Sequence, residues 1–409
     1  MPRIKAFQAL RPAPGFESRV ASVPYDVVSR DEAAALAQGN PLSFLHVVRP
    51  DIDFPPETDP CDPQVYRRAA ENFQRLQSDG VLIRDAQPGV FAYRQTMAGR
   101  SQTGVVCCCH IDDYEQNRIL KHEKTRQAKE DDRTRHVLAL NANAGPVFLT
   151  YRDVPEVTSL VADASRAAAL YDFVAVDGIR HTVWRISDPA TCVSSLSAVP
   201  VFYVADGHHR AASAWRAGVQ RKLANPQHTG QEEYNWFLTV LFPASELRIL
   251  PYNRVLRDLN GHTPRQLLER LREVGTVVET SNPSPPAAGS FSVFVDQRWW
   301  LVTVSASSIS RNTPTASLDV ALLEERVLHP IFGIGDVRSD PRIDFVGGIR
   351  GTAELEQLVR SGTWAAAVSM YPTSIDQLMA VSDAGQIMPP KSTWFEPKLR
   401  SGLLVHTLD

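Results

Sequence analysis

The chain has 409 residues, 43 of them basic and 46 acidic, which gives a formal net charge of −3 at pH 7. A balance so close to neutral argues against nucleic acid as a partner, because binding would then need a local basic patch. Hydrophobic residues make up 43 % and charged residues 22 % of the chain, the composition of a soluble globular protein with a large core. No apolar run reaches the roughly 18 residues that span a bilayer, and the start lacks the apolar stretch of a signal peptide. We therefore expect a cytoplasmic protein with no membrane partner.

Helices and strands alternate along the first third of the chain. Ser29 and Glu32 form the capping-box pattern that opens a short helix. Apolar residues at helical spacing predict an amphipathic helix over 63–79. Strands are expected at 89–96 and 103–111.

The rest of the chain continues this alternation without a repeat of fixed period. The expected elements are strands at 147–151, 172–176, 181–187 and 201–205, a helix at 155–169, and later strands at 235–242, 247–251, 290–295 and 299–304. Together they predict a mixed α/β (α+β) fold. We place a soft boundary near residue 260, between a core at 1–260 that includes an N-terminal substrate segment and an α/β region at 261–409 that folds back on the site.

The strongest motif follows the strand expected at 201–205. Its residues are Asp206, Gly207, His208, His209 and Arg210. They lead into a helix, so Asp206 falls near the helix N-cap. A helix N-terminus offers unpaired N–H groups and a positive dipole end, Gly207 lets the backbone approach closely, and Arg210 can fork onto two oxygens. This pattern predicts a phosphate-binding site, and the alternative is a capped helix with a polar first turn.

A second cluster of charges lies within Lys121–Arg133. On a helix, four potentially cationic groups would share one face and form a rail for phosphates. These groups are His122, Arg126, Lys129 and Arg133. Glu123 and Glu130 would lie on a neighbouring strip, where they could face a metal or a hydroxyl. The alternative is a solvated helix whose Glu and Lys residues form i,i+4 pairs.

Two further segments supply candidate site residues. In the N-terminal part, Asp26 is either a second site carboxylate or part of a plain turn. The substrate-binding candidates near it are Tyr25, Ser43, His46 and Arg49; Arg49 could clamp a substrate carboxylate or be a surface arginine. In the C-terminal part, the loop with Lys391, Ser392 and Thr393 could close over phosphates or be an ordinary surface loop.

These residues together make up the inventory of a phosphoryl-transfer site. Such a site needs cations around the phosphates, Mg²⁺ held by one or two carboxylates, and a carboxylate that orients or deprotonates the attacking hydroxyl. The catalytic candidates are Asp206, Glu123 and Asp26, and the metal candidates are Asp206 and Glu123. The same inventory suits a nucleotide hydrolase. The chain has no Gly-x-x-x-x-Gly-Lys-Ser/Thr loop, Asp-Phe-Gly or Gly-x-Ser-x-Gly motif, which disfavours the familiar kinase folds and serine hydrolases.

Several of these segments also resemble a known family. Four segments that run through the chain in order resemble a domain-of-unknown-function family, number 1015: Val23–Val28, Ser43–Val47, Lys121–Arg126 with Lys129–Asp132 and Arg133, and Met388–Thr393. The Asp206–Arg210 string resembles the nucleotide-contacting motif of the ParB-N/sulfiredoxin-like superfamily, in the form carried by free-serine kinases. This resemblance implies a ParB/sulfiredoxin-like nucleotide-binding core.

The resemblance also implies an activity. It suggests a kinase, a phosphotransferase acting on an alcohol group, with ATP or ADP as phosphate donor, Mg²⁺, and a small hydroxyl substrate such as free L-serine, which would give O-phospho-L-serine. In those kinases an N-terminal acidic residue assists the motif aspartate, and here Asp26 and Glu123 are both candidates for that role. The alternative is a ParB-like nucleotide-binding or nucleotide-hydrolysing regulatory module, against which the near-neutral charge and the lack of a helix-turn-helix extension argue. The sequence leaves a homodimer open.

These interpretations lead to one geometric expectation. The side chains of Arg126 and Lys129 should converge with His208, His209 and Arg210 on one cleft, because a phosphate chain at Gly207 must lie within reach of the rail. Glu123 or Asp26 should border that cleft.

Overall fold

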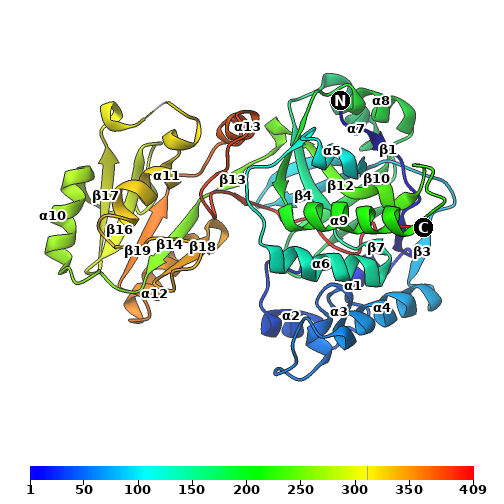
Figure 1. The fold of residues 1–409 in the computed structure, drawn as a ribbon, viewed down its shortest axis with the longest axis horizontal. Helices are drawn as coiled ribbons and strands as arrows, with labels where there is room; N and C mark the ends of the chain where they lie inside the picture. The colour runs from blue at the N-terminus through cyan, green and yellow to red at the C-terminus, as the bar shows by residue number, and fades with distance from the viewer. Residues whose placement is uncertain (311) are drawn as a thin grey trace. The chain divides into compact units, whose positions relative to one another are not determined.

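A computed structural model describes residues 1–310 and 312–409 and divides them into two compact units (Figure 1). The first unit comprises Met1–Leu247 and Pro397–Asp409, and the second comprises Arg248–Glu396. The second unit is therefore inserted into the sequence of the first. Both units mix helices and strands, which confirms the predicted mixed fold class. The sequence predicts a boundary near residue 260, whereas the chain leaves the first unit after Leu247, because Ile249 already pairs with Phe395 of the second unit.

The first unit is built on a mostly antiparallel sheet, which has nine strands among the described residues. Its order is β6-β11-β8-β12-β5-β4-β10-β9, with β1 paired to β5. The strands are β1 (Ile4–Lys5), β4 (Phe91–Met97), β5 (Arg100–His110), β6 (Ile119–Leu120), β8 (Val147–Tyr151), β9 (Tyr171–Val174), β10 (Arg180–Arg185), β11 (Phe202–Asp206) and β12 (Trp236–Pro243). Two small ladders complete the unit: β2 (Leu10–Pro12) with β3 (Leu82–Arg84), and β7 (Ala142–Asn143) with β21 (His406–Thr407).

The central strands are apolar along their whole length because both of their faces are covered. Every residue of β8 is buried, and in β11 only Asp206 is not. Phe202 and Val204 of β11 share one core cluster with Leu149 of β8 and Phe237 of β12. Continuous rather than alternating hydrophobicity is typical of strands buried on both faces. The apolar run that ends at Asp206 is therefore a buried inner strand.

The helices of the first unit are α1 (Glu17–Val20), α2 (Arg30–Ala37), α3 (Leu45–Val48), α4 (Pro63–Ser78), α5 (Ile111–Glu115), α6 (Gln127–Leu140), α7 (Pro155–Ala164), α8 (Pro189–Ser197) and α9 (His208–Ala224), with short 3₁₀ turns η1 (Pro50–Asp53), η2 (Glu233–Asn235) and η3 (Ala244–Glu246). α2 begins with the predicted capping box, since Ser29 and Glu32 make both reciprocal bonds. α9 packs on β8 and β12, and α6 packs beside α9 (Figure 1). No helix among the described residues is both long and apolar enough to cross a membrane.

The helix expected across 121–133 is shorter than predicted. α6 begins only at Gln127, and 121–126 is an extended segment after β6. Arg126 has φ −99° and ψ 128°, outside the helical region. Its backbone N–H donates to His209 Nε2, and the His122 ring is buried against His208. Tertiary contacts with α9 thus outweigh the local helical pattern, and the predicted four-residue rail on one helix face is wrong.

The second unit contains a six-stranded antiparallel sheet of order β15-β17-β16-β19-β14-β18. Its strands are β13 (Ile249–Leu250), β14 (Tyr252–Leu256), β15 (Gly275–Thr280), β16 (Ser290–Val295), β17 (Arg298–Val304), β18 (Ile343–Gly347), β19 (Ala366–Met370) and β20 (Trp394–Phe395), where β13 and β20 pair separately. Its helices are α10 (Pro264–Val274), α11 (Asp319–Leu323), α12 (Gly351–Arg360) and α13 (Ile375–Asp383), with a π-helix η6 (Glu324–Leu328) and short 3₁₀ turns η4 (Ala306–Ser308), η5 (Thr315–Ser317) and η7 (Gly348–Arg350). Leu355 of α12 packs on Phe294 and Ala367 of the sheet.

Candidate functional site

The junction between β11 and α9 shapes the predicted motif. Val204 pairs with Leu149 and Asp206 with Phe148, so Ala205 is an extra residue in the strand and forms a bulge. A bulge redirects the side chain that follows it. The side chain of Asp206 remains 28 % exposed at the end of an otherwise buried strand. The bulge thereby presents a carboxylate at the start of α9.

Gly207 is the N-cap of α9, whereas the sequence places the N-cap one residue earlier, near Asp206. Its backbone is left-handed, with φ 88° and ψ 33°, and its N–H donates to Asp206 Oδ1 at 2.8 Å. A β-carbon at this position would lie 3.0 Å from Arg210 Nε. Both the conformation and the close guanidinium therefore favour glycine. The next N–H groups, which begin α9, have no partner within the helix and carry its positive dipole end.

Asp206 lies between two cations. Lys398 Nζ is 3.2 Å and Arg210 Nη2 is 3.8 Å from Asp206 Oδ2. Burial alone would raise the pKa of Asp206, but Lys398 and Arg210 outweigh it and hold that pKa well below its usual range. The carboxylate is therefore ionised at neutral pH.

Arg210 joins Asp206 to a second carboxylate. Its Nη2 atom is 3.8 Å from Asp26 Oδ2, so the two carboxylates are no more than twice that distance apart. Its Nη1 donates to the Pro146 carbonyl at 2.5 Å. The Arg210 side chain is only 10 % exposed, whereas that of Asp26 is 35 % exposed. Burial opposes the charge, yet Asp26 and Asp206 raise the pKa of Arg210 above its ordinary value.

The motif residue His208 and His122 form a pair of buried imidazoles. The rings of His122 and His208 meet edge to face with centroids 4.5 Å apart, and Glu123 Oε2 is 3.7 Å from His208 Nδ1. Burial lowers the pKa of His122 to about 3 and that of His208 to about 4. Both rings are neutral at pH 7. They belong to the site as neutral polar groups rather than as the cations that a rail would require.

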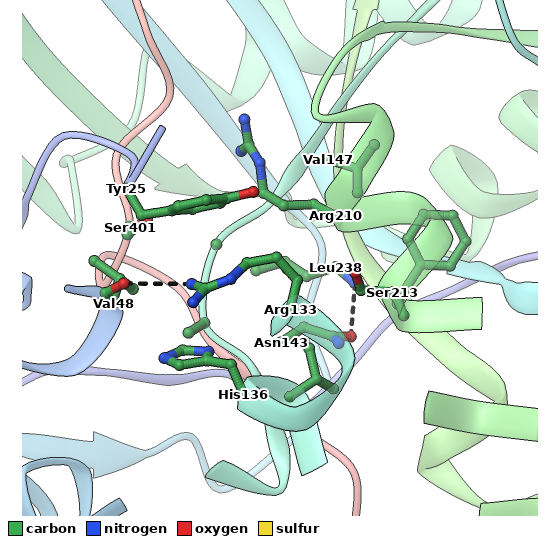
Figure 2. Close-up of a pocket in the computed structure, with 15 residues that line it drawn as sticks. Tyr25, Val48, Arg133, His136, Asn143, Val147, Arg210, Ser213, Leu238 and Ser401 are labelled. Carbon is green, nitrogen blue, oxygen red and sulfur yellow. Dashed lines mark hydrogen bonds between the residues drawn. The ribbon is translucent and has the colours of Figure 1, made fainter. Parts of the chain in front are cut away.

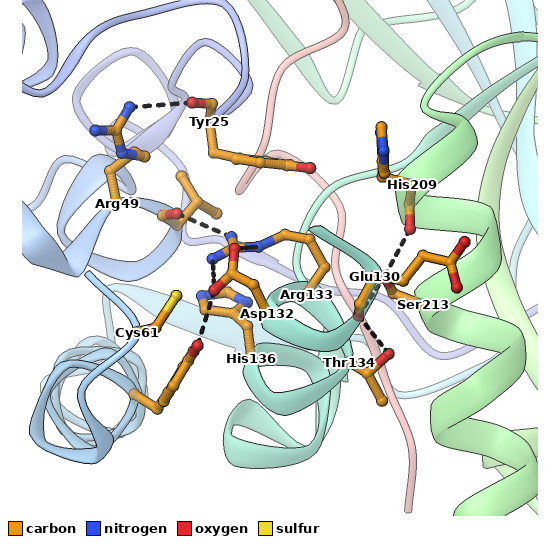
Figure 3. A network of polar contacts seen from close by, with 12 residues as sticks. Tyr25, Arg49, Cys61, Glu130, Asp132, Arg133, Thr134, His136, His209 and Ser213 are labelled. Carbon is orange, nitrogen blue, oxygen red and sulfur yellow. Dashed lines mark hydrogen bonds and ion pairs between the residues drawn. The ribbon is translucent and has the colours of Figure 1, made fainter. Parts of the chain in front are cut away.

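His209 is oriented by the loop before α6. The Arg126 N–H donates to His209 Nε2 at 3.1 Å, so the ring carries its proton on Nδ1. Its backbone carbonyl accepts the Ser213 hydroxyl within α9 at 2.6 Å (Figure 3). Burial lowers the pKa of His209 as well. The 121–126 segment therefore lies directly against the motif, although it is not helical.

The two basic residues predicted on α6 do not form part of a rail. Arg133 makes a two-pronged pair with Asp132, at 2.9 and 3.1 Å, and lies under the Tyr25 ring at 4.4 Å from its centroid. Asp132 also accepts the Tyr66 hydroxyl at 2.9 Å. Lys129 is exposed. The Arg126 backbone contacts His209, and convergence of the Arg126 and Lys129 side chains on the motif stays a prediction.

A small cavity of about 40 Å³ adjoins the motif. Tyr25, Arg133, His136, Arg210 and Ser401 are among the residues that line it (Figure 2). The Tyr25 ring lies over Arg133, and its hydroxyl points toward Arg210 (Figure 2). Burial raises the pKa of that hydroxyl, so it is protonated at neutral pH. Of the four predicted substrate residues, Tyr25 is thus the one beside the motif.

The other three substrate candidates make contacts within the N-terminal segment. Arg49 donates to the carbonyls of Tyr25 and Val28, at 3.2 and 2.6 Å, and pairs with Asp51 at 2.8 Å. Its guanidinium therefore holds the turn that carries Tyr25 and Asp26 instead of presenting a fork to a substrate. His46 Nδ1 lies 2.6 Å from Asp53 Oδ1. The Ser43 hydroxyl accepts the Leu45 N–H at 3.3 Å.

The predicted C-terminal phosphate loop belongs to the second unit. Lys391 has φ 58°, and its carbonyl accepts a bond from Arg254 Nη2 at 3.2 Å. The Ser392 hydroxyl donates to the Pro389 carbonyl at 2.6 Å, and the Ser392 carbonyl accepts from the Thr373 hydroxyl at 2.9 Å. These bonds give the loop a defined shape. A phosphate-binding role for Lys391, Ser392 and Thr393 stays a prediction.

Lys398 contacts Asp206, although no motif in the sequence assigns it to the site. It lies 192 positions from Asp206 in the sequence, and no local pattern links a lysine after a Pro-rich loop to a particular carboxylate. The feature of the sequence that could have pointed to Lys398 is its position shortly after Met388–Thr393, the last segment that resembles the family.

A role of Asp206 and Glu123 in holding Mg²⁺ stays a prediction. Among the described residues no group of three or more His, Cys, Asp or Glu side chains is arranged to hold a metal ion. Mg²⁺ in nucleotide enzymes usually needs only one or two protein carboxylates. Asp206 with Glu123 or Asp26 would supply that number.

Comparison with known proteins places the chain in a family. Residues 4–321 match the family described as "Protein of unknown function (DUF1015)", and the chain belongs to it. No curated protein matches the chain.

Solved structures that resemble the chain do so at low identity. One is a free serine kinase in complex with AMP, 12 % identical with a TM-score of 0.36 over 73 % of this chain and 91 % of that chain. Another is a conserved hypothetical protein from Pyrococcus furiosus, 12 % identical with a TM-score of 0.35 over 72 % of this chain and 93 % of that chain. A third is SbnI with C-terminal truncation from Staphylococcus aureus, 12 % identical with a TM-score of 0.39 over 73 % of this chain and 86 % of that chain.

Proposed function

We propose that this protein is a nucleotide-dependent kinase that phosphorylates a small hydroxyl compound, with ATP or ADP as the phosphate donor. Free L-serine, giving O-phospho-L-serine, is the substrate that the motif resemblance implies. One observation carries the proposal: the left-handed Gly207 opens α9 between Asp206 and Arg210, with Lys398 against the same carboxylate. Unpaired N–H groups, two cations and a carboxylate are thereby gathered around one helix N-terminus.

Phosphate binding follows from this arrangement. The first N–H groups of α9 and the dipole of the helix favour an anionic group at Gly207. The Arg210 guanidinium lies beside it, and its buried Nε has no hydrogen-bond partner among the described residues. The neutral His209 keeps its Nδ1 proton as a further donor, because its Nε2 accepts the Arg126 N–H. These groups would neutralise the negative charge of the transferred phosphoryl group, which is the main task of an enzyme of this kind.

The three carboxylates would have different roles in the transfer reaction. Asp206 is held ionised by Lys398 and Arg210, so it is a poor acceptor for the substrate proton and a good partner for cations. Asp26 and Glu123 are more exposed, at 35 % and 38 %, and one of them would accept the proton of the attacking hydroxyl. Asp206 with Glu123 or Asp26 would hold Mg²⁺, which when bound neutralises phosphate oxygens.

A direct assay tests the proposal. The purified full-length chain is incubated with Mg²⁺, each of ATP, ADP and pyrophosphate, and each of L-serine, L-threonine and L-homoserine, and phosphorylated products are detected by mass spectrometry. The proposal predicts a phosphorylated hydroxyl amino acid in at least one combination. Nucleotide hydrolysis without transfer to any of these acceptors would instead favour a hydrolase, and no turnover of any donor would contradict both.

A further inference from the structure

The segment 397–409, here called the C-terminal strap, brings a residue into the site from far along the sequence. The chain returns to the first unit at Pro397, and the next residue is Lys398. Its Nζ atom lies 3.2 Å from Asp206 Oδ2, and its side chain is only 11 % exposed. We propose that Lys398 is a further phosphate-binding residue and that a buried polar network in the sheet holds the strap so as to place it. This inference rests on the proposed function.

Two glutamines of the sheet hold the backbone of Lys398. Gln95 of β4 donates from Nε2 to the Lys398 carbonyl at 2.8 Å. Gln102 of β5 in turn donates to Gln95 Oε1 at 3.1 Å. Both glutamines are buried, with at most 1 % exposure. A buried amide N–H without a hydrogen-bond partner costs stability. The Lys398 carbonyl supplies the partner for Gln95 Nε2, so the buried side chain favours this position of the strap.

Arg400 provides a second anchor two residues later. Its Nε donates to His181 Nε2 at 3.0 Å, and it pairs with Asp177. An arginine can only donate, so the His181 proton is on Nδ1, which lies 2.7 Å from the Tyr93 hydroxyl. Burial lowers the pKa of His181 to about 3, which keeps the ring neutral and able to accept this bond.

Ser401 provides a third anchor. Its N–H donates to the Ser22 carbonyl at 2.9 Å, and the Ser22 N–H donates to the Ser401 carbonyl at 3.1 Å. The strap is thus fixed at 398, 400 and 401. The side chain of Lys398 therefore starts from a backbone that is held in place, and it carries its ammonium group to Asp206.

The charges at the site explain why a lysine is placed there. Arg210 is shared between Asp206 and Asp26, so Arg210 and Lys398 together place two cations beside two carboxylates. Gly207 follows Asp206 directly, and a phosphate at the start of α9 would lie within the roughly 6 Å reach of a lysine side chain. The ammonium can therefore turn from Asp206 to the phosphate, as lysines do at other phosphate sites, and leave the carboxylate for a metal ion.

A double-mutant comparison separates phosphate binding from simple neutralisation of Asp206. The full-length chain is prepared as wild type, Asp206→Asn, and Asp206→Asn/Lys398→Met, and binding of ADP and of adenosine is measured by titration calorimetry. The double variant leaves no unpaired charge from this ion pair, so it should fold. Lys222→Met, at an exposed position near the end of α9, is the control for removal of a lysine.

We expect the double variant to bind ADP about 10- to 100-fold more weakly than Asp206→Asn, the loss of one charge-assisted contact, with adenosine affected far less. Lys222→Met should bind ADP as wild type does. Equal ADP affinity in Asp206→Asn and in the double variant would overturn the role of Lys398 and leave the proposed function standing. A wild-type chain that binds neither ADP nor ATP would overturn the proposed function itself.

Discussion

Replacing Gly207 by alanine tests whether the start of α9 is the phosphate site. An alanine at φ 88° must adopt the left-handed conformation, which costs about 1–2 kcal/mol of stability. The new β-carbon would also lie 3.0 Å from Arg210 Nε and 3.1 Å from Cζ, so the guanidinium must move. Losing one charge-assisted contact of Arg210 would add about 1.5–3 kcal/mol to the cost of binding phosphate. We therefore expect nucleotide affinity to fall at least about tenfold.

Gly80→Ala is the matched control for this substitution. Gly80 has φ 68°, and a β-carbon there would meet nothing within 4 Å. It lies after α4, so its loss should cost a similar amount of stability without changing nucleotide binding. Urea unfolding gives the first quantity and titration with ADP or ATP the second. If both variants bound nucleotide as wild type does, the phosphates would not lie at Gly207.

Three further predictions follow from the same geometry. Asp206→Asn removes a proposed Mg²⁺ ligand and should lower the rate of phosphoryl transfer by about two to four orders of magnitude while the circular dichroism spectrum is unchanged, and a rate within tenfold of wild type would rule out a catalytic role. Arg210→Lys keeps the charge but loses the planar fork, so it should weaken nucleotide binding, whereas Lys124→Ala, at an exposed position, should not; equal losses would mean that the guanidinium fork is irrelevant. Stability should fall as the pH drops from about 6.5 toward 4, by up to about 1.4 kcal/mol per pH unit for each buried histidine, because unfolding lets His122 and His208 take up protons that the native state excludes. Urea unfolding of wild type and of His208→Asn across this range measures the last effect, and identical slopes for the two proteins would count against a neutral, buried His208.

The β11–α9 junction could be predicted from the sequence because local rules and tertiary structure agree there. A buried strand is a continuous apolar run in the sequence, and Asp206-Gly207 marks a turn before a helical stretch that contains Ala211 and Ala212. Strand β11 spans Phe202–Asp206, within one residue of the predicted 201–205, and α9 begins at His208. What the sequence could not show is the bulge at Ala205, which depends on pairing with β8.

The 121–126 segment shows where local rules fail. Its charges recur at helical spacing and no Gly or Pro interrupts them, so the pattern predicts a helix. The structure instead buries His122 against His208 and uses the Arg126 N–H to orient His209. Both partners are more than 80 positions away, and such contacts leave no trace in local periodicity.

The contacts of Arg49 and of Lys398 could not be predicted from the sequence. An arginine near the substrate segment looks like a carboxylate clamp, yet the Arg49 guanidinium is occupied by Asp51 and by the carbonyls of Tyr25 and Val28. Lys398 has no motif of its own and nevertheless lies against Asp206. Which charged groups are already paired is decided by the fold, and a single sequence does not record it.

A crystal structure of the protein with ADP or a non-hydrolysable ATP analogue would test the central claim most directly. We expect phosphate oxygens on the N–H groups at the start of α9, with Arg210 and Lys398 within hydrogen-bond distance and Asp206 beside them. A nucleotide bound elsewhere, with the start of α9 unchanged from the nucleotide-free protein, would contradict the kinase site proposed for this protein.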